Sequence, residues 1–129
     1  MNADAMQLAY VRAIQERGIL SFVNFEDLDY YPQRIMLMYG VPKGEIRGNH
    51  GHRKDRHLIT CVSGKVKVDL TTKDGTETHI LNKGDSVLQE IYVWGVQEYL
   101  EDNTIMVVLC SEKFDSSEYI NDINEILDR

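Results

Sequence analysis

The sequence predicts a mainly β fold of the sandwich, jelly-roll or small-barrel class, with one helix at its C-terminal end. From Arg34 onward, short strand-like runs recur at regular spacing and are separated by turn residues. Residues 65–71 alternate strictly between polar and apolar, which is the pattern of a half-buried strand. The Asp74-Gly75 pair that follows is a strong hairpin signal.

The expected elements follow the chain in order. Residues 7–16 are compatible with a helix on propensity alone, whereas residues 19–25, after Arg17-Gly18, favour a turn into a strand. Strands are then expected over residues 34–39, 57–62, 65–71, 78–81, 86–92, 93–99 and 104–109. Asp115 and Glu118 have the spacing of a capping box, and apolar residues recur at helical spacing after them. We therefore expect one helix over residues 116–127, lying on the outside of the β body.

Length, charge and cysteine content exclude several classes of protein. Residues 1–129 are long enough for one domain with a single core. The net charge of −7 argues against a nucleic-acid partner, but a local basic cluster that suits an anionic small molecule occurs at Arg47, Arg53, Lys54 and Arg56. No run approaches the ~18 apolar residues of a membrane span, and the first residues lack signal-peptide features. Cys61 and Cys110 lie in apolar contexts, so we expect buried free thiols and a cytoplasmic protein.

The run from Arg47 to Leu58 is the most informative feature, because it contains three of the four histidines. His50 and His52 are two residues apart, and such residues point to the same face of a β-strand. The glycines before and between them, Gly48 and Gly51, are expected to leave space beside the imidazoles. Because the ordinary histidine pKa lies near neutrality, the pair favours either proton transfer or a metal site.

Three interpretations of the histidines stay open on the residues alone. In the first, they are ordinary surface or core residues. In the second, His50, His52 and His57 supply three nitrogen ligands to Zn, Fe, Ni or Cu. In the third, His50 and His52 are an acid–base pair. The metal site lacks a further expected ligand, because the hairpin near residues 84–99 contains no histidine. The remaining histidine, His79, lies on a different β segment beside a turn.

An ordered set of motifs resembles the sugar-nucleotide 3,4-ketoisomerases of the cupin superfamily, which act on dTDP-4-keto-6-deoxyglucose. The matching segments are Arg17-Gly18-x-Leu20, residues 40–54, 61–66 and 107–111, Val93-Trp94, and Phe114-Asp115-x-x-Glu118-Tyr119-Ile120. They span roughly residues 15–128. The resemblance implies a cupin double-stranded β-helix, or jelly roll, with one C-terminal helix. It also implies a homodimer that exchanges N-terminal strands within residues 1–25.

The resemblance further implies a cofactor-free and metal-free reaction on a dTDP-linked 4-keto-6-deoxy sugar. A base removes the C3 proton, which the 4-keto group acidifies, an enediol forms, and a proton is delivered to C4. The two active-site histidines of the family align with His50 and His52. The 3-keto product usually passes to an aminotransferase that makes a 3-amino-3,6-dideoxy sugar for a cell-surface glycan.

Additional residues are expected to bind the substrate. Arginine grips a diphosphate through two parallel hydrogen bonds, so Arg47 is the first candidate, ahead of Arg34 and Lys54. Trp94 would stack on thymine or the sugar. The expected substrate-binding residues are Arg47, Arg34, Lys54, His57, Trp94 and Tyr39. Each has a structural alternative as a rim charge or a core side chain.

The chain departs from the family pattern in the expected barrel lining. Met36-Leu37 replaces a usual pair of tyrosines, His57 replaces a usual glutamine, and Gly95-Val96 follows the tryptophan in place of His-Glu. The general cupin metal motif has Glu at the position of His57 and His at that of Gly95. A full four-ligand metal site is therefore not expected. These departures are explained by an altered substrate stereochemistry, by a weakened activity or by neutral repacking of the barrel. Two alternative functions also stay open: a metal-dependent cupin enzyme and a non-catalytic sugar-nucleotide-binding cupin.

Overall fold

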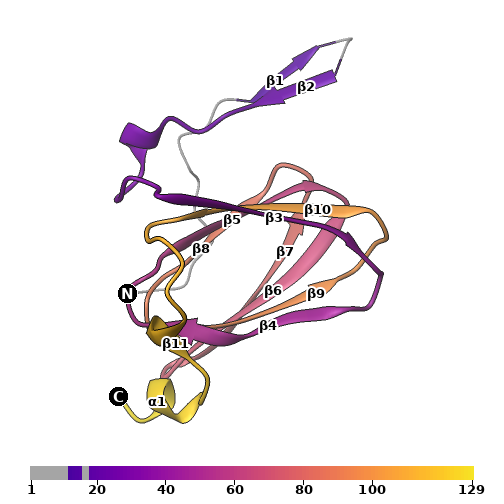
Figure 1. Cartoon of the computed structure of the whole chain (residues 1–129). Coiled ribbons are helices and arrows are strands. Elements are labelled where there is room, and N and C mark those ends of the chain that lie inside the picture. Colours follow the sequence, from indigo (N-terminus) through magenta and orange to yellow (C-terminus); the bar gives the residue numbers. More distant parts are fainter. Residues whose placement is uncertain (1–11, 16–17) are drawn as a thin grey trace.

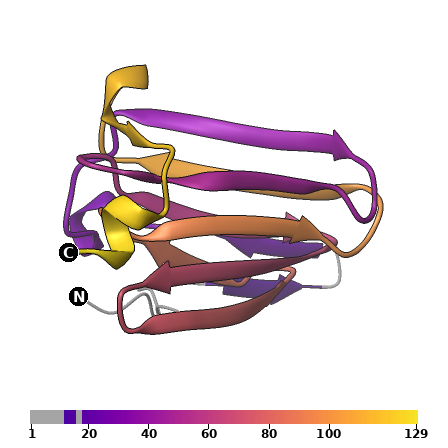
Figure 2. The same cartoon turned by 90° about the horizontal axis from the view of Figure 1, so that it is seen from below.

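The computed structural model describes residues 12–15 and 18–129 and contains two antiparallel sheets that face each other (Figure 1). The first sheet has the strand order β3-β10-β5-β8, and the second has the order β11-β4-β9-β6-β7. Seen from below, the strands of the second sheet run side by side across one layer of the molecule (Figure 2). This is the predicted double-stranded β-helix.

Most strands of the two sheets lie within a few residues of the expected ranges, whereas β4 and β11 fall outside those ranges. The first sheet consists of β3 (Arg34–Val41), β10 (Thr104–Cys110), β5 (His57–Ser63) and β8 (Ser86–Gln89). The second consists of β11 (Tyr119–Ile120), β4 (Ile46–His52), β9 (Trp94–Tyr99), β6 (Lys65–Thr72) and β7 (Gly75–Asn82). The expected strand over residues 86–92 is shorter, because β8 ends at Gln89 and a turn with Tyr92 at φ 57 follows.

The core lies between the two sheets. The alternation predicted for β6 places Val66, Val68 and Leu70 inside. The remaining buried members come from both sheets: Ile59, Cys61, Leu81, Val87, Val93, Tyr99, Met106, Val108 and Cys110. Cys61 and Cys110 are free thiols, as expected, and burial raises the pKa of each to about 11. Both thiols are therefore protonated and unreactive at neutral pH.

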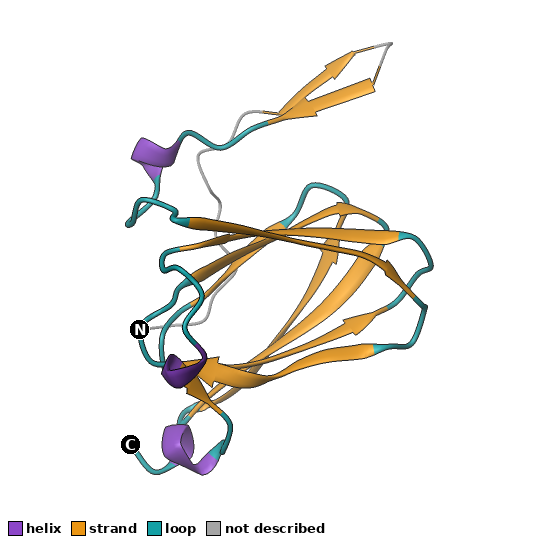
Figure 3. Cartoon of the chain, in the orientation of Figure 1, coloured by secondary structure: helices purple, strands orange, loops and turns teal. Residues whose placement is uncertain are grey.

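The prediction of one helix over residues 116–127 is wrong. The segment divides into a 3₁₀ turn η2 (Ser116–Glu118), the strand β11 and a short helix α1 (Asn124–Leu127) (Figure 3). β11 pairs with the end of β4, so Tyr119 lies opposite His52 and Ile120 opposite Gly51. The open edge of β4 offers unpaired backbone groups, and pairing with them overrides the local helical pattern.

The N-terminal hairpin stands apart from the barrel in Figure 1. It consists of β1 (Arg12–Gln15) and β2 (Gly18–Ser21), and η1 (Phe25–Asp27) follows it. A helix is therefore wrong for residues 12–15, and the rest of the 7–16 range lies outside the described residues. In the part of the chain that the structure describes, no helix is long and apolar enough to cross a membrane.

Candidate active site

The end of β4 gathers His50 and His52 in one cluster with residues from two other segments. The ring centroids of His50 and His52 are 5.0 Å apart, and that of His57, at the start of β5, is 4.2 Å from His52. Tyr119 of β11 lies against both, at 4.8 Å from His50 and 4.7 Å from His52. The structure therefore brings the three sequence-identified histidines together and adds a tyrosine.

Gly51 does not leave space beside the imidazoles as expected. A Cβ atom there would lie 2.9 Å from Cδ1 of Ile126 and 3.1 Å from the carbonyl oxygen of Val93. Successive residues of a strand face opposite sides, so this glycine makes room for the C-terminal segment behind β4. An irregularity between Gly48 and His50, with Asn49 at φ 64, precedes the two histidines.

His52 is held by the carboxylate of Glu118. Nδ1 of His52 lies 2.6 Å from Oε2 of Glu118, and both side chains are buried. The second oxygen of Glu118 accepts hydrogen bonds from the backbone N–H groups of Lys54 (3.1 Å) and Asp55 (3.0 Å). A carboxylate only accepts hydrogen bonds, so Nδ1 carries the proton and Nε2 keeps a lone pair. Nε2 is buried and has no hydrogen-bond partner among the described residues.

Both histidines of the pair are neutral at pH 7. Burial, followed by the charge of His57, lowers the pKa of His52 to about 4, against the opposing effect of Glu118. Burial, again followed by the charge of His57, also lowers the pKa of His50. A neutral imidazole has one N–H and one lone pair, so each ring can accept a proton at one nitrogen and donate one from the other.

His57 belongs to a second histidine–carboxylate pair. Its Nε2 atom lies 2.8 Å from Oδ2 of Asp55, and the same oxygen accepts a 2.7 Å hydrogen bond from Arg34. Burial would raise the pKa of Asp55, but the hydrogen bond and charge of His57, with Arg34, outweigh it and lower that pKa. Asp55 is thus a buried anion that neutralises Arg34.

The structure separates two expected substrate residues from the histidines. Tyr39 is 73% exposed and lies on the outward face of β3 with Ile35 and Leu37. Trp94 is buried beneath the C-terminal segment, where it forms a separate apolar cluster with Ile120 and Ile126. Successive residues of a strand face opposite sides, but the sequence does not say which side faces the histidines. The structure shows that Tyr39 and Trp94 lie on the other side of their strands. Within one chain, Tyr39 and Trp94 therefore lie outside the histidine cluster.

The three basic candidates differ in their relation to the cluster. Arg34 reaches it through Asp55. Arg47 is exposed on β4, opposite Gln97, and its charge contributes to the lowered pKa of His50. Lys54 is exposed in the loop between β4 and β5 and meets Glu118 through its backbone N–H. Arg34 and Arg47 therefore place positive charge at the histidines.

The expected position of a second-hairpin ligand is filled by an amide. Gly95 lies directly opposite His50, and a Cβ atom on Gly95 would lie 2.6 Å from the side-chain amide of Gln89. That amide donates hydrogen bonds to the carbonyl oxygens of Val93 (3.0 Å) and His50 (3.4 Å). No ligand can be added at position 95 without moving Gln89.

The described residues that could together hold a metal ion are His52, Asp55 and His57, whose ligand atoms lie within 4.8 Å of one another. This set differs from the three histidines expected from the sequence, because His50 is absent from it. The guanidinium of Arg34 lies 2.7 Å from an oxygen of Asp55. Because that charge repels a cation at the same carboxylate, the group suits a hydrogen-bonded network better than a metal.

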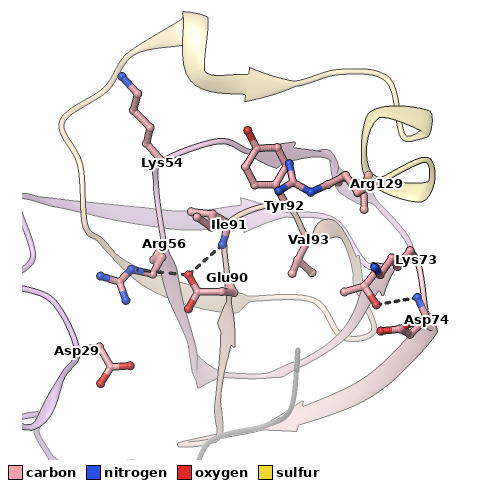
Figure 4. Close-up of a pocket in the computed structure, with 12 residues that line it drawn as sticks. Asp29, Lys54, Arg56, Lys73, Asp74, Glu90, Ile91, Tyr92, Val93 and Arg129 are labelled. Atoms are coloured by element: carbon pink, nitrogen blue, oxygen red, sulfur yellow. Dashed lines mark hydrogen bonds and ion pairs between the residues drawn. The ribbon is translucent and has the colours of Figure 1, made fainter. Parts of the chain in front are cut away.

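Two cavities are lined by residues of the β4–β5 loop, which connects the two strands that bear the clustered histidines. One, of about 690 Å³, is lined among others by Arg56, Glu90, Tyr92 and Arg129, and Glu90 lies 3.7 Å from Arg56 (Figure 4). Another, about 290 Å³, is lined by Glu118, Phe114 and Lys54. Of the residues in the histidine cluster, Glu118 is the one that lines a described cavity. Lys54 lines both of these cavities.

Four residues at or beside the histidine cluster were not predicted from the sequence to lie there: Asp55, Gln89, Glu118 and Tyr119. The Asp-x-His spacing of Asp55 and His57 is a weak signal that was available. Glu118 was interpreted as the second member of a capping box and, with Tyr119, as part of the family motif, but its contact with His52 was not predicted. Asp115 does cap η2 by accepting from the Ser117 backbone N–H, whereas Glu118 turns inward to His52.

Comparisons with known proteins agree with this architecture. The family model described as "FdtA: WxcM-like, C-terminal" matches residues 1–129. A curated TDP-4-oxo-6-deoxy-alpha-D-glucose-3,4-oxoisomerase of Aneurinibacillus thermoaerophilus is 24% identical over 116 residues, which cover 86% of this chain and 81% of that protein.

Two solved structures share the fold at low identity. A variant of the QdtA 3,4-ketoisomerase of Thermoanaerobacterium thermosaccharolyticum, in complex with TDP-4-keto-6-deoxyglucose, has a TM-score of 0.89 and 22% identity, covering 99% of this chain and 94% of that chain. The WlaRB TDP-quinovose 3,4-ketoisomerase of Campylobacter jejuni has a TM-score of 0.85 and 20% identity, covering 95% of each chain.

Proposed function

The chain belongs to the FdtA, WxcM-like C-terminal family, and from that premise we propose that it is a 3,4-ketoisomerase of a TDP-linked 4-keto-6-deoxyhexose. The observation that carries this proposal is the adjacent pair His50 and His52, both neutral, with the lone pair of His52 Nε2 unpartnered. The resemblance seen in the sequence and the relatives found by comparison point to the same reaction.

The reaction moves a carbonyl group by one carbon. One imidazole accepts the C3 proton, and the electron pair of that C–H bond forms the C3–C4 double bond of an enediol while the C4 oxygen takes up a proton from water. The enediol then loses its O3 proton to water as C4 accepts a proton from the other imidazole, and exchange with water moves the proton of the first imidazole back to the second. The product is a 3-keto isomer of the substrate, so no oxidant or reductant is consumed. Two amphoteric imidazoles 5.0 Å apart suit adjacent carbons.

Positive charge near the histidines serves the diphosphate. We assign this contact to Arg47, which is exposed on β4 three residues before His50 and whose charge lowers the pKa of His50, with Arg34 next in order. Tyr119 lies against both imidazoles and joins the list of residues that would meet the sugar. The 3-keto product is the substrate class of an aminotransferase that builds a 3-amino sugar for a surface glycan.

A homodimer with exchanged N-terminal strands is also part of the proposal. The outward face of the β3-β10-β5-β8 sheet exposes Leu37 (57%) and Ile35 (59%), and Leu20 of β2 is 59% exposed. An apolar face of this kind is usually covered by a partner. The β1-β2 hairpin stands away from the barrel and could reach a second copy (Figure 1). Part of residues 1–25 lies outside the described residues. We place the protein in the cytoplasm, where its two thiols stay reduced.

The test is turnover of TDP-4-keto-6-deoxyglucose followed by NMR. In D₂O, the proposal expects deuterium at C4 of the 3-keto product and, through the reverse reaction, at C3 of the remaining 4-keto substrate. In H₂O, the coupling between H4 and H5 of the product reports the configuration at C4. No exchange at high enzyme concentration would contradict the proposal for this substrate. Binding without exchange, seen as a raised melting temperature, would instead support a non-catalytic sugar-nucleotide-binding protein.

Single variants assign the roles of the two histidines. His50→Asn and His52→Asn each remove an imidazole from the pair, and each is expected to lower turnover about 10²–10⁴-fold. The variant that abolishes deuterium exchange at C3 identifies the base. His79→Asn, on β7, is the matched control and should turn over like the parent protein.

A further inference from the structure

His57 is the member of the histidine cluster that the proposed reaction leaves unused. It is 4% exposed, and its Nε2 atom lies 2.8 Å from Oδ2 of Asp55. Its ring centroid lies 4.2 Å from that of His52, with the planes at 44°. A buried titratable ring in direct contact with a proposed acid–base residue affects both the position and the charge of that residue.

Asp55 fixes the orientation of the His57 ring. Its Oδ2 atom also accepts a 2.7 Å hydrogen bond from Arg34, and its Oδ1 atom accepts from the Glu112 backbone N–H (3.0 Å) and the Ser111 hydroxyl (3.5 Å). Asp55 is 1% exposed. A carboxylate with both oxygens engaged cannot rotate freely, and because it only accepts hydrogen bonds, Nε2 of His57 carries a proton.

We propose that His57 is a positioning residue for His52, and that Asp55 and Arg34 hold it in that role. The inference rests on the proposed function, because it gives His57 a part in that reaction. The fixed ring, with its centroid 4.2 Å from that of His52, limits rotation of the His52 imidazole. It also opposes a positive charge on His52, because two adjacent imidazolium ions repel each other. Nε2 of His52 thereby stays unprotonated and in place for the substrate.

The charged and titratable groups around His52 and His57 come from several elements: His50 of β4, Glu118 of η2, Tyr119 of β11, Arg34 of β3, Cys110 of β10, and Asp55 of the β4–β5 loop. Glu118 favours a proton on His52, whereas burial and His57 oppose it. Arg34 offsets the charge of Asp55, and the buried thiol of Cys110 is uncharged. His57 thus opposes the effect of Glu118 on the pKa of His52.

The experiment compares His57→Gln with the matched control His79→Gln. The pKa of His52 is read from ¹⁵N-histidine NMR, and the pH profiles of kcat and kcat/KM are measured for TDP-4-keto-6-deoxyglucose. For His57→Gln we expect the pKa of His52 and the acid limb of kcat/KM to rise by about one pH unit. We also expect kcat to fall about tenfold with KM unchanged, since misplacement affects the reacting atoms. A merely structural role would lower activity without moving the acid limb.

A folded His57→Gln variant with an unchanged His52 titration would overturn the inference. If that variant does not fold, the unmodified protein gives the second test. His52 must then carry its proton on Nδ1 and His57 on Nε2, and a proton on Nε2 of His52 at pH 7 would equally refute the proposal. The NMR titration needs no turnover. A protein without isomerase activity but with the expected His52 shift would refute the proposed function and leave the coupling between the two rings established.

Discussion

Replacing Glu118 by glutamine is the sharpest test of the site, because the shape of the side chain is kept and only its charge and one acceptor are lost. Oε1 of the new amide can still accept from the backbone N–H groups of Lys54 and Asp55. Its NH₂ group must then face Nδ1 of His52, which lies 2.6 Å from Glu118 in the parent protein. Two donors cannot share a hydrogen bond, so the His52 proton moves to Nε2.

The size of the effect follows from this contact. A carboxylate 2.6 Å from an imidazolium is worth about 6 kcal/mol at an effective dielectric constant of about 20. In a transition state in which the proton is half transferred to His52, the variant lacks about half of this stabilisation, or about 3 kcal/mol. That difference corresponds to a rate loss of about 10²-fold. The wrong tautomer adds to this and takes the expected loss to about 10²–10⁴-fold. Stability should fall by only about 1 kcal/mol, because both backbone donors keep their acceptor.

The assay is single-turnover NMR with TDP-4-keto-6-deoxyglucose, with the His52 tautomer read from ¹⁵N shifts. Glu101→Gln is the matched control, because Glu101 is half exposed and lies 3.8 Å from Lys65. It should leave turnover and tautomer unchanged. A folded Glu118→Gln protein that turns over within about threefold of the parent, with the His52 proton still on Nδ1, would refute the reasoning.

Three more predictions address stability and assembly. Because the pKa of His52 is about 4 when folded against its ordinary 6.5, the unfolded chain takes up this proton first on acidification. The stability from this group is complete above pH 6.5, is lost as the pH falls towards 4, and should be reduced by about 2 kcal/mol at pH 5, measured by urea unfolding. If the free energy of unfolding falls equally between pH 6.5 and 5 in the parent protein and in His52→Asn, this prediction is wrong. Gly95→Ala places a Cβ atom 2.6 Å from the Gln89 amide, so we expect a loss of about 1–3 kcal/mol in thermal unfolding, and full stability would show that Gln89 moves freely. Leu37→Glu puts a charge on the exposed face of β3 and should convert a dimer to a monomer in sedimentation, whereas Lys73→Glu, in the exposed β6–β7 turn, should not.

Most strands were predictable from the sequence because a strand pattern is local. The alternation over residues 65–71 and the Asp74-Gly75 turn were enough to place β6 and β7. The C-terminal segment was not predictable in this way. Its apolar spacing fits a helix, but β4 lacks a partner along one edge, and pairing of Tyr119 and Ile120 with that edge decided the structure. An open sheet edge is a property of the assembled fold and leaves no mark on the local sequence.

The sequence by itself determined that His50 and His52 share a face, because two residues on a strand always do when they are two apart. It also determined the family, through an ordered set of motifs. Only the tertiary structure decided that Trp94 and Tyr39 point away from these histidines, that Gln89 occupies the space opposite His50, and that Glu118 and Asp55 orient His52 and His57. The physical reason is that a period of two residues states which side chains lie together but not which side is inside. Which carboxylate meets which imidazole depends on segments up to 66 residues apart in the chain, as for His52 and Glu118.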